Sequence, residues 1–209
     1  MKLINQQLIK NTNLKQIYNL VHQEQGISRA ELAKRTKLSK TTVSALVDEL
    51  LERDFLMDTG TSDSKTVGRK PNSLQLKPER HYVAVLCWEE EQVLGYLTDI
   101  CGSVAVTCRT AVKETDSYVE RSRALFDLEL LPAISPEKLL GICIVVPAMI
   151  DPDTREIFST SFHLPDRTES DIVGELAATF REYPVALLND TACTAYAEKV
   201  YTGIREKDF

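Results

Sequence analysis

Long apolar runs are missing from this sequence of 209 residues. No stretch approaches the roughly 18 consecutive apolar residues that a membrane span needs, and residues 1–7 lack the apolar core of a signal peptide. We therefore expect a cytoplasmic protein without a membrane partner. Because 43% of the residues are hydrophobic, the chain can form one small and one medium domain, each with its own core.

Paired cysteines are missing as well. The five cysteines are odd in number, and no two of them stand in the C-x-x-C spacing of zinc knuckles and thiol redox motifs. Most lie within apolar, strand-like runs, so we interpret all five as buried thiols rather than metal ligands. They are Cys87, Cys101, Cys108, Cys143 and Cys193. We accordingly expect neither a metal ion nor a cofactor.

Basic residues are scarce in the second part of the chain. Residues 81–209 hold 11 Lys and Arg against 22 Asp and Glu, whereas residues 1–80 hold 14 against 9. The first part is therefore net positive and the second strongly negative, although the whole chain carries only -6. A basic module on an acidic body is typical of a protein that binds nucleic acid locally.

Residues 26–53 have the pattern of a helix-turn-helix. Ser28 and Glu31 stand in the S-x-x-E relation of a capping box, which predicts a helix over residues 29–36. After a tight turn, Ser39 is a good N-cap residue for a second helix. Apolar residues of that helix recur at i, i+3, i+4 and i+7 and form one inward-facing stripe. These residues are Val43, Leu46, Val47 and Leu50.

The free face of the second helix carries short polar and basic side chains. Such side chains let a helix backbone approach the major groove and can hydrogen-bond bases or phosphates. Asp48, one turn further along, would repel phosphate and is a less favourable contact. A winged helix that binds only protein is the alternative. The predicted DNA contacts are Arg29, Ser39, Lys40, Thr41, Thr42 and Ser44.

The flanking segments complete a winged helix. Residues 14–21 repeat the helical spacing of apolar side chains, with Asn13 as a candidate cap. Downstream, short strands at 55–57 and 73–76 bracket a polar segment that suits a mobile wing. At the distal end of this wing, a basic pair beside Gly and Pro could reach phosphates or a minor groove, or could lie in a solvated loop. The pair is Arg69 and Lys70.

From His81 onward the pattern is mixed α/β, and we expect a domain boundary between residues 78 and 79. The predicted order is βββ-α-β-α-β-α, with a shorter strand pair after the fourth strand. Residues 139–146 form a continuous apolar run of the kind expected for a strand buried on both faces. The other strands are expected at 82–88, 92–98, 103–112 and 185–188, the strand pair within 148–159, and the helices at 117–130, 169–181 and 190–201.

Five stretches carry a resemblance to a known family: I-S-R-A-E-L-A at 27–33, L-S-K-T-T-V-S at 38–44, G-R-K-P at 68–71, V-V-P-A-M-I-D at 145–151 and N-D-T-A-C-T-A-Y-A-E at 189–198. They resemble the ROK family (repressor, open reading frame, kinase), most closely its xylose- and N-acetylglucosamine-responsive repressors. The resemblance covers the chain essentially end to end. It implies an actin/hexokinase-like (ribonuclease H-like) lobe after the winged helix, a sugar or sugar-phosphate effector, and a homodimer or larger assembly on a palindromic operator of double-stranded DNA.

The sequence departs from the family where its kinases bind ATP. Those kinases carry an Asp-x-Gly turn after the first strand, because glycine lets backbone N–H groups approach the phosphates. Here residues 88–91 read Trp-Glu-Glu-Glu, and three carboxylates would repel phosphate. The resemblance also implies a second lobe with adenosine contacts and, in many members, a zinc site, neither of which lies within these residues. We therefore expect no catalysis, and an open apolar face that favours dimerisation or instability.

Part of the family's sugar site is retained. Asn189 and Asp190 match the pair in which the Asp acts as the kinases' base. Pro147-Ala148 stands in place of Pro-Gly, Ala192 in place of a second Asn, and His163 in place of an Asn that contacts the sugar. The resemblance thus implies sugar contacts by Asn189, Asp190 and His163. Alternatively, Asn189 and Asp190 only cap the last helix, and His163 is a surface or packing residue.

These features favour a DNA-binding transcriptional regulator, and in particular a repressor of carbohydrate-utilisation genes whose DNA affinity changes when a sugar binds. One alternative is a constitutive DNA-binding protein that uses the kinase-like lobe only to dimerise. Another is a sugar kinase with an accessory domain, against which the lost glycine turn stands.

Overall fold

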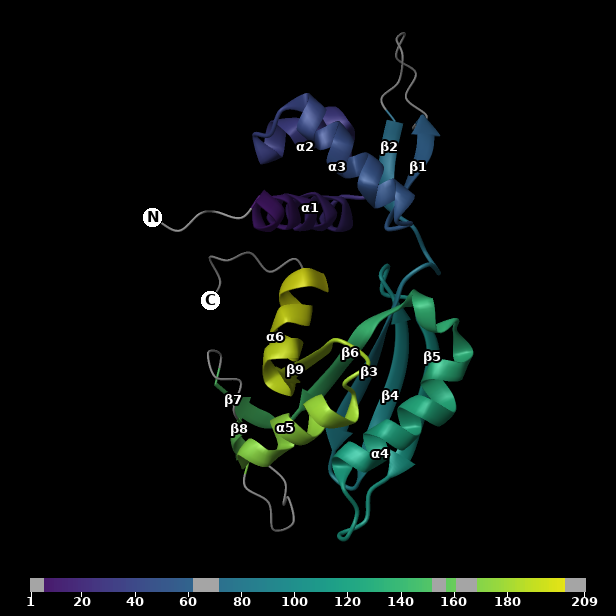
Figure 1. Ribbon diagram of the computed structural model, residues 1–209, viewed down its shortest axis with the longest axis vertical. Helices are drawn as coiled ribbons and strands as arrows, with labels where there is room; N and C mark the ends of the chain where they lie inside the picture. Colours follow the sequence, from purple (N-terminus) through teal and green to yellow (C-terminus); the bar gives the residue numbers. More distant parts are fainter. Residues whose placement is uncertain (1–5, 62–71, 152–156, 161–168, 202–209) are drawn as a thin grey trace. The chain divides into compact units, whose positions relative to one another are not determined.

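The computed structural model describes residues 6–61, 72–151, 157–160 and 169–201 (Figure 1). The chain divides into two compact units, Met1–His81 and Tyr82–Phe209. In the first unit, three helices are followed by a two-stranded antiparallel sheet, which is the element order of a winged helix. The elements are α1 (Gln6–Gln23), α2 (Arg29–Thr36), α3 (Lys40–Glu52), β1 (Leu56–Thr61) and β2 (Asn72–Leu76).

The core of the first unit is formed by one apolar stripe from each helix and by the inner face of β2. Its fully buried side chains include Ile17 on α1, Leu32 on α2, Val43 on α3 and Leu74 on β2. Asn13 does not cap α1 as predicted, because the helix already begins at Gln6 and continues through that position.

The strand β1 is also longer than its sequence suggested. It runs through Gly60 to Thr61, into the segment expected to form the wing, because pairing with β2 continues there across an irregularity in register. Arg69 and Lys70 lie outside the described residues.

The second unit contains a mixed five-stranded sheet in the order β5-β4-β3-β6-β9. β3 pairs antiparallel with β4 and β4 with β5, whereas β6 and β9 run parallel to β3. A separate antiparallel pair follows β6, at the place expected from the sequence. The bounds are β3 (Tyr82–Glu89), β4 (Gln92–Asp99), β5 (Val104–Ala111), β6 (Leu139–Val146), β7 (Ala148–Ile150), β8 (Ile157–Thr160) and β9 (Val185–Asn189).

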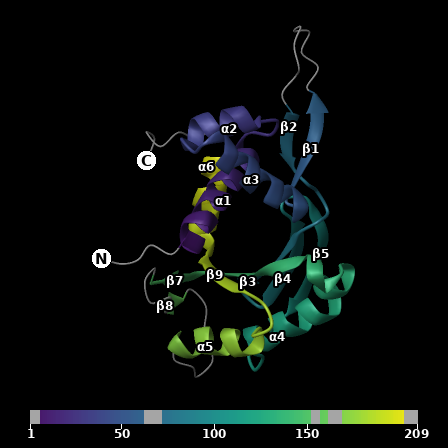
Figure 2. The same ribbon diagram turned by 45° about the horizontal axis from the view of Figure 1, so that its top comes forward.

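Helices lie on both sides of this sheet (Figure 2). α4 (Tyr118–Leu125) and α5 (Glu169–Thr179) pack on one face, and α6 (Asp190–Tyr201) lies on the other. α4 passes into a π-helical turn, Phe126–Leu130, so the single helix predicted over 117–130 changes its hydrogen bonding at Phe126. The first and last residues of that turn are fully buried, because they fill the space under the sheet. The 3-10 turns Leu131–Ala133 and Pro136–Lys138 then lead to β6.

The two faces of the sheet are buried to different degrees. On β6, Ile144 and Val146 are buried under α4 and α5, whereas Cys143 and Val145 on the α6 side are half-buried. The prediction that β6 is buried on both faces is therefore wrong, because α6 covers its face only in part. The prediction of five buried thiols is wrong for Cys101, which is exposed in the turn between β4 and β5, and the other four are half-buried. No helix among the described residues is long and apolar enough to cross a membrane.

Candidate nucleic-acid interface

Serine side chains cap both helices of the helix-turn-helix. The Oγ of Ser28 accepts a hydrogen bond from the Glu31 N–H (3.2 Å), and the Oγ of Ser39 accepts one from the Thr42 N–H (3.1 Å). Each bond satisfies one of the N–H groups that a helix start leaves without a partner, so each fixes where its helix begins. The predicted starts of α2 and α3 are thus confirmed.

α3 presents its polar residues on the side away from the core. Its apolar stripe is at most 5% exposed, whereas Lys40, Thr41 and Thr42 are exposed and Ser44 is half-buried. Ser39, just before the helix, is exposed as well and lies 2.8 Å from the hydroxyl of Thr42 through its own Oγ. Five of the predicted DNA contacts, Ser39, Lys40, Thr41, Thr42 and Ser44, are therefore brought together at the start of α3.

Arg29 is already bound within the protein. Its guanidinium Nη1 lies 2.7 Å from Oδ1 of Asp48 and donates a longer hydrogen bond, 3.4 Å, to the backbone oxygen of Ser44. The predicted phosphate contact and the predicted repulsive carboxylate are thus partners that tie α2 to α3. Their spacing along the chain gives no local signal, so sequence reasoning missed the pair.

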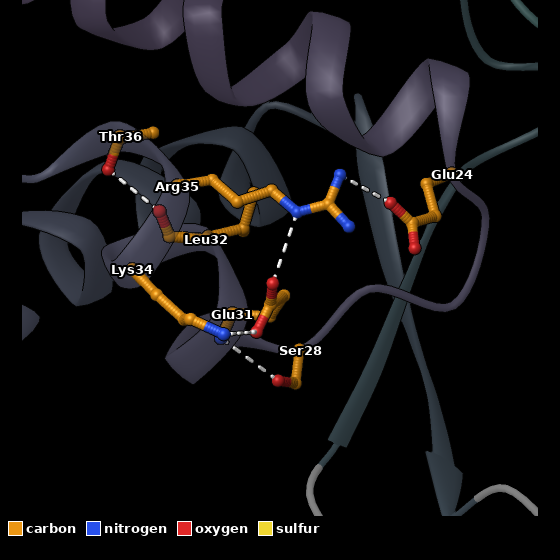
Figure 3. A network of polar contacts seen from close by, with 7 residues as sticks. All are labelled: Glu24, Ser28, Glu31, Leu32, Lys34, Arg35 and Thr36. Atoms are coloured by element: carbon orange, nitrogen blue, oxygen red, sulfur yellow. Dashed lines mark hydrogen bonds and ion pairs between the residues drawn. The ribbon is translucent and has the colours of Figure 1, made fainter.

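Other basic residues of the motif are also ion-paired (Figure 3). Arg35 binds Glu24 (2.6 Å) and Glu31 (3.2 Å), and the hydrogen bond from its side chain to Glu31 is the main cause of its raised pKa. Lys34 lies 3.9 Å from the same Glu31 carboxylate. These charges are partly neutralised before DNA is present, so they contribute less to phosphate binding.

Lys37 and Lys40 differ from these residues. Both side chains are exposed, and neither has an ion pair among the residues that the structure describes. They flank Ser39, so the unneutralised positive charge of the motif is concentrated around the N-terminus of α3. The sequence predicted Lys40 as a DNA contact and did not single out Lys37, although the two stand in a K-x-x-K spacing across the turn.

The chain that leaves the winged helix is attached to the end of α3. The N–H of Lys77 donates to the carbonyl oxygen of Phe55 (3.0 Å), and its ammonium group pairs with the carboxylate of Asp54. That ion pair is the main cause of the lowered pKa of Asp54. His81 completes the attachment, because its Nε2 lies 2.7 Å from the carbonyl oxygen of Arg53.

In the second unit, the acidic turn between β3 and β4 is closed by Tyr118. The hydroxyl of Tyr118 donates to the carbonyl oxygen of Glu89 (2.8 Å) and accepts from the N–H of Glu91 (3.1 Å). The carboxylate-bearing residues of the turn are exposed. A phosphate at this turn would have to displace a tyrosine hydroxyl and face three carboxylates, which is electrostatically unfavourable.

Asn189 and Asp190 lie where β9 ends and α6 begins. The Oδ1 of Asn189 accepts from the N–H of Ala192 (2.8 Å) and its Nδ2 donates to the carbonyl oxygen of Ala148 (2.7 Å). The Oδ1 of Asp190 accepts from the N–H of Thr191 (2.6 Å). Both side chains therefore serve the start of α6, as the capping alternative stated, and their contact with a sugar stays a prediction.

His163, the third predicted sugar contact, lies outside the described residues. Among the residues that the structure does describe, no cluster of His, Cys, Asp and Glu side chains is arranged to hold a metal ion.

Comparison with known proteins relates the chain to regulators. Residues 10–57 match the family model described as winged helix-turn-helix DNA-binding. Over 216 residues the chain is 27% identical to the xylose repressor of Bacillus subtilis (strain 168), covering 100% of this chain and 54% of the relative. It is 24% identical over 163 residues to the DNA-binding transcriptional dual regulator NagC of Escherichia coli (strain K12), covering 73% and 38%. The chain thus spans about half the length of the curated relatives it matches.

The fold has a solved counterpart. The crystal structure of a ROK family transcriptional regulator, a homologue of the E. coli MLC protein, matches 92% of this chain and 49% of its own, with a TM-score of 0.73 and 19% sequence identity. A likeness at that identity establishes the fold, and it confirms the predicted combination of a winged helix with a mixed α/β lobe. The sequence similarity, the fold and the motifs therefore all indicate a winged helix followed by a mixed α/β lobe.

Proposed function

We propose that this chain, which joins a winged helix to the lobe fold of a ROK family regulator, acts as a transcriptional repressor of carbohydrate-utilisation genes. It would bind a palindromic operator as a homodimer and change its DNA affinity when a sugar or sugar phosphate binds the second unit. The observation that carries the proposal is the exposed N-terminal turn of α3, where short polar side chains and two unpaired lysines surround a helix start. A DNA partner implies that the protein works in the cytoplasm.

The proposed DNA contacts divide into two kinds. Thr41, Thr42 and Ser44 can hydrogen-bond base edges in the major groove, where sequence is read. Lys40 and the helix N-terminus bind phosphates, which fixes the position of α3 on the duplex. Arg69 and Lys70 of the wing are proposed as additional backbone or minor-groove contacts.

The proposed sugar site lies at the carboxyl ends of the parallel strands β6 and β9. In open α/β sheets, ligands bind at this edge. The hydrogen bond from Asn189 to Ala148 supports the proposal, because it ties the end of β9 to the first residue of β7, two residues beyond β6, with Asp190 beside it. The names of the relatives, xylose repressor and N-acetylglucosamine repressor, support a sugar as the effector.

We further propose that the chain is not an enzyme. The Tyr118 hydroxyl uses the Glu91 N–H, and the turn carries carboxylates where a kinase needs backbone N–H groups turned toward phosphate. A coupled phosphorylation assay with D-xylose and N-acetylglucosamine should therefore give no turnover above that of a protein-free control.

The repressor function can be tested by fluorescence anisotropy with duplexes tiled across the DNA that flanks its own gene. We expect one fragment to bind more tightly than the others, and D-xylose or N-acetylglucosamine to change that affinity. Binding with equal affinity to every fragment would show that the chain recognises no specific operator in this DNA, which would contradict the proposal. Selective binding that no tested sugar changes would leave a constitutive DNA-binding protein.

A constitutive DNA-binding protein that uses the second unit only to dimerise is the second candidate function, and one observation favours it. Leu188, Tyr196 and Val200, at the end of β9 and on α6, are 42%, 69% and 41% exposed, which is unusual for large apolar side chains. Such side chains suit a contact between two copies of the lobe. Sedimentation of Tyr196→Glu beside the parent chain tests dimerisation, and a thermal shift with each sugar tests sensing separately.

A further inference from the structure

Lys37, in the turn of the helix-turn-helix, has a backbone conformation that lysine rarely adopts. Its φ of 59° and ψ of 19° lie in the left-handed region, where an L side chain crowds the backbone and glycine does not. Glycine and asparagine are the usual residues at the end of a helix in this conformation. A lysine in this conformation is a reason to look for a function of its side chain.

The other left-handed residues with side chains give a useful contrast. In the described part of the chain they are all acidic: the Asp54 carboxylate pairs with Lys77, the backbone N–H of Glu91 donates to the Tyr118 hydroxyl, and Glu79 is not without a partner. Lys37 is instead an exposed cation that has no ion pair among the described residues. No internal ion pair among the described residues therefore accounts for a lysine side chain at this position.

The surroundings of Lys37 indicate an anionic ligand. It precedes Ser39, the N-cap of α3, and lies one residue beyond α2. The N-terminus of α3 adds the positive end of a helix dipole, and Lys40 adds a second unpaired ammonium group. The nearby guanidinium groups of Arg29 and Arg35 are held by Asp48 and Glu24, so the two lysines carry most of the charge available here.

We propose that Lys37 binds a phosphate of the DNA backbone beside the N-terminus of α3. This inference rests on the proposed function and adds a residue to it. A cation in the turn, rather than on the helix face, contacts backbone and not bases, and it sets how deeply the start of α3 enters the groove.

Lys37→Gly separates the effect of the lost cation on DNA binding from any effect on folding, because glycine suits the left-handed turn but carries no charge. We expect the unfolding temperature to stay equal or rise, while affinity for a short duplex of mixed sequence falls several-fold. The slope of log Kobs against log salt should become shallower by about 0.9, which corresponds to one lost phosphate contact. Lys37→Arg keeps the cation and should keep the parent's slope.

The matched control is Lys15→Ala, which removes an exposed lysine of α1 that has no ion pair among the described residues. It should leave the slope unchanged. If Lys37→Gly binds with the parent's affinity and slope, or if both variants lower the slope equally, the inference is wrong while the proposed function stands. If the parent binds no duplex at all, the proposed function fails and the inference fails with it.

Discussion

The imidazole ring of His81 stacks on the phenyl ring of Phe55, with ring centroids 4.0 Å apart and an interplanar angle of 21°. The guanidinium carbon of Arg53, the residue that follows α3, lies 5.2 Å from the centroid of the same phenyl ring. His81 is the last residue of the first unit. The stack therefore fixes the last residue of the first unit beside the end of α3.

If the chain is the sugar-responsive repressor proposed above, replacing His81 with Ala should reduce the effect of the sugar on DNA affinity and leave DNA affinity itself unchanged. Loss of the stack and of the contact with the Arg53 carbonyl detaches the linker from α3, while the polar face of α3 is untouched. We expect operator affinity close to that of the parent and a smaller change on adding the effector sugar, both measured by anisotropy. His81→Phe, which keeps an aromatic ring, is the control and should respond more than His81→Ala. An equal sugar response in the parent and in His81→Ala would show that the contacts of His81 with Phe55 and Arg53 do not carry that response.

Phe55→Ala should destabilise the winged helix by about 2 kcal/mol. The substitution removes the stack with His81 and the edge contact with Tyr18, whose ring centroid lies 6.2 Å away. Urea unfolding followed by circular dichroism measures the change. Phe55→Tyr keeps the ring and should stay within about 1 kcal/mol of the parent.

Asp48→Ala should strengthen DNA binding that does not depend on sequence. The substitution removes a carboxylate from the exposed face of α3 and frees Arg29 to bind phosphate. The salt slope on a duplex of mixed sequence should steepen by about 0.9. Because the pair is partly exposed, stability should change by less than about 1 kcal/mol. The double variant Arg29→Ala, Asp48→Ala should return the slope toward that of the parent; an unchanged slope in the single variant would mean that Arg29 stays away from DNA.

Thiol alkylation at pH 8 should proceed first at Cys101. Burial raises the pKa of Cys87 to about 11 and that of Cys143 to about 12, so few thiolates form at these sites. The pKa of Cys101 is raised as well, by partial burial and then by Asp99, but its side chain is exposed to the reagent. Mass spectrometry of peptides after brief treatment with iodoacetamide measures the order. Faster modification of Cys143 than of Cys101 in folded protein would contradict the packing of α6 over β6.

Asp116 should contribute to the acid sensitivity of the second unit. Hydrogen bonds from the Lys113 N–H and then from Arg121 lower its pKa below the ordinary value of 3.8. A carboxyl group whose pKa is lower in the folded state stabilises the fold fully above the unfolded value, and this contribution is lost as the pH falls through the folded value. Asp116→Asn should therefore be less stable than the parent at pH 7 and should lose less stability below pH 4. Urea midpoints across this range measure both effects.

The elements that the sequence predicted well are those defined by nearby residues. The starts of α2 and α3 depend on Ser28 and Ser39, and the stripe from Val43 to Leu50 follows from helical spacing alone. The π-helical turn at Phe126 could not be predicted in this way, because it depends on how Phe126 and Leu130 fit against the sheet and the aromatic ring of Phe180.

In the candidate site, too, the sequence predicted only what depends on residues close together along the chain. Its polar side chains were recognisable because they lie consecutively along one helix. The partner of Arg29 was not, because Asp48 comes from a different helix and is brought near by packing. The hydroxyl of Tyr118 likewise reaches the turn at Glu91 only in the folded lobe.

The central position of β3 has a consequence for synthesis of the chain. Its neighbour β4 follows at once and closes a meander with β5, whereas its other neighbour, β6, comes only after α4. A nascent chain that has released β5 but not β6 therefore presents one unpaired edge of a hydrophobic strand, which is a template for pairing with another chain. Ribosomes that pause before Leu139 would expose this edge for longest, so slow translation of the segment between β5 and β6 should favour aggregation of the newly made protein.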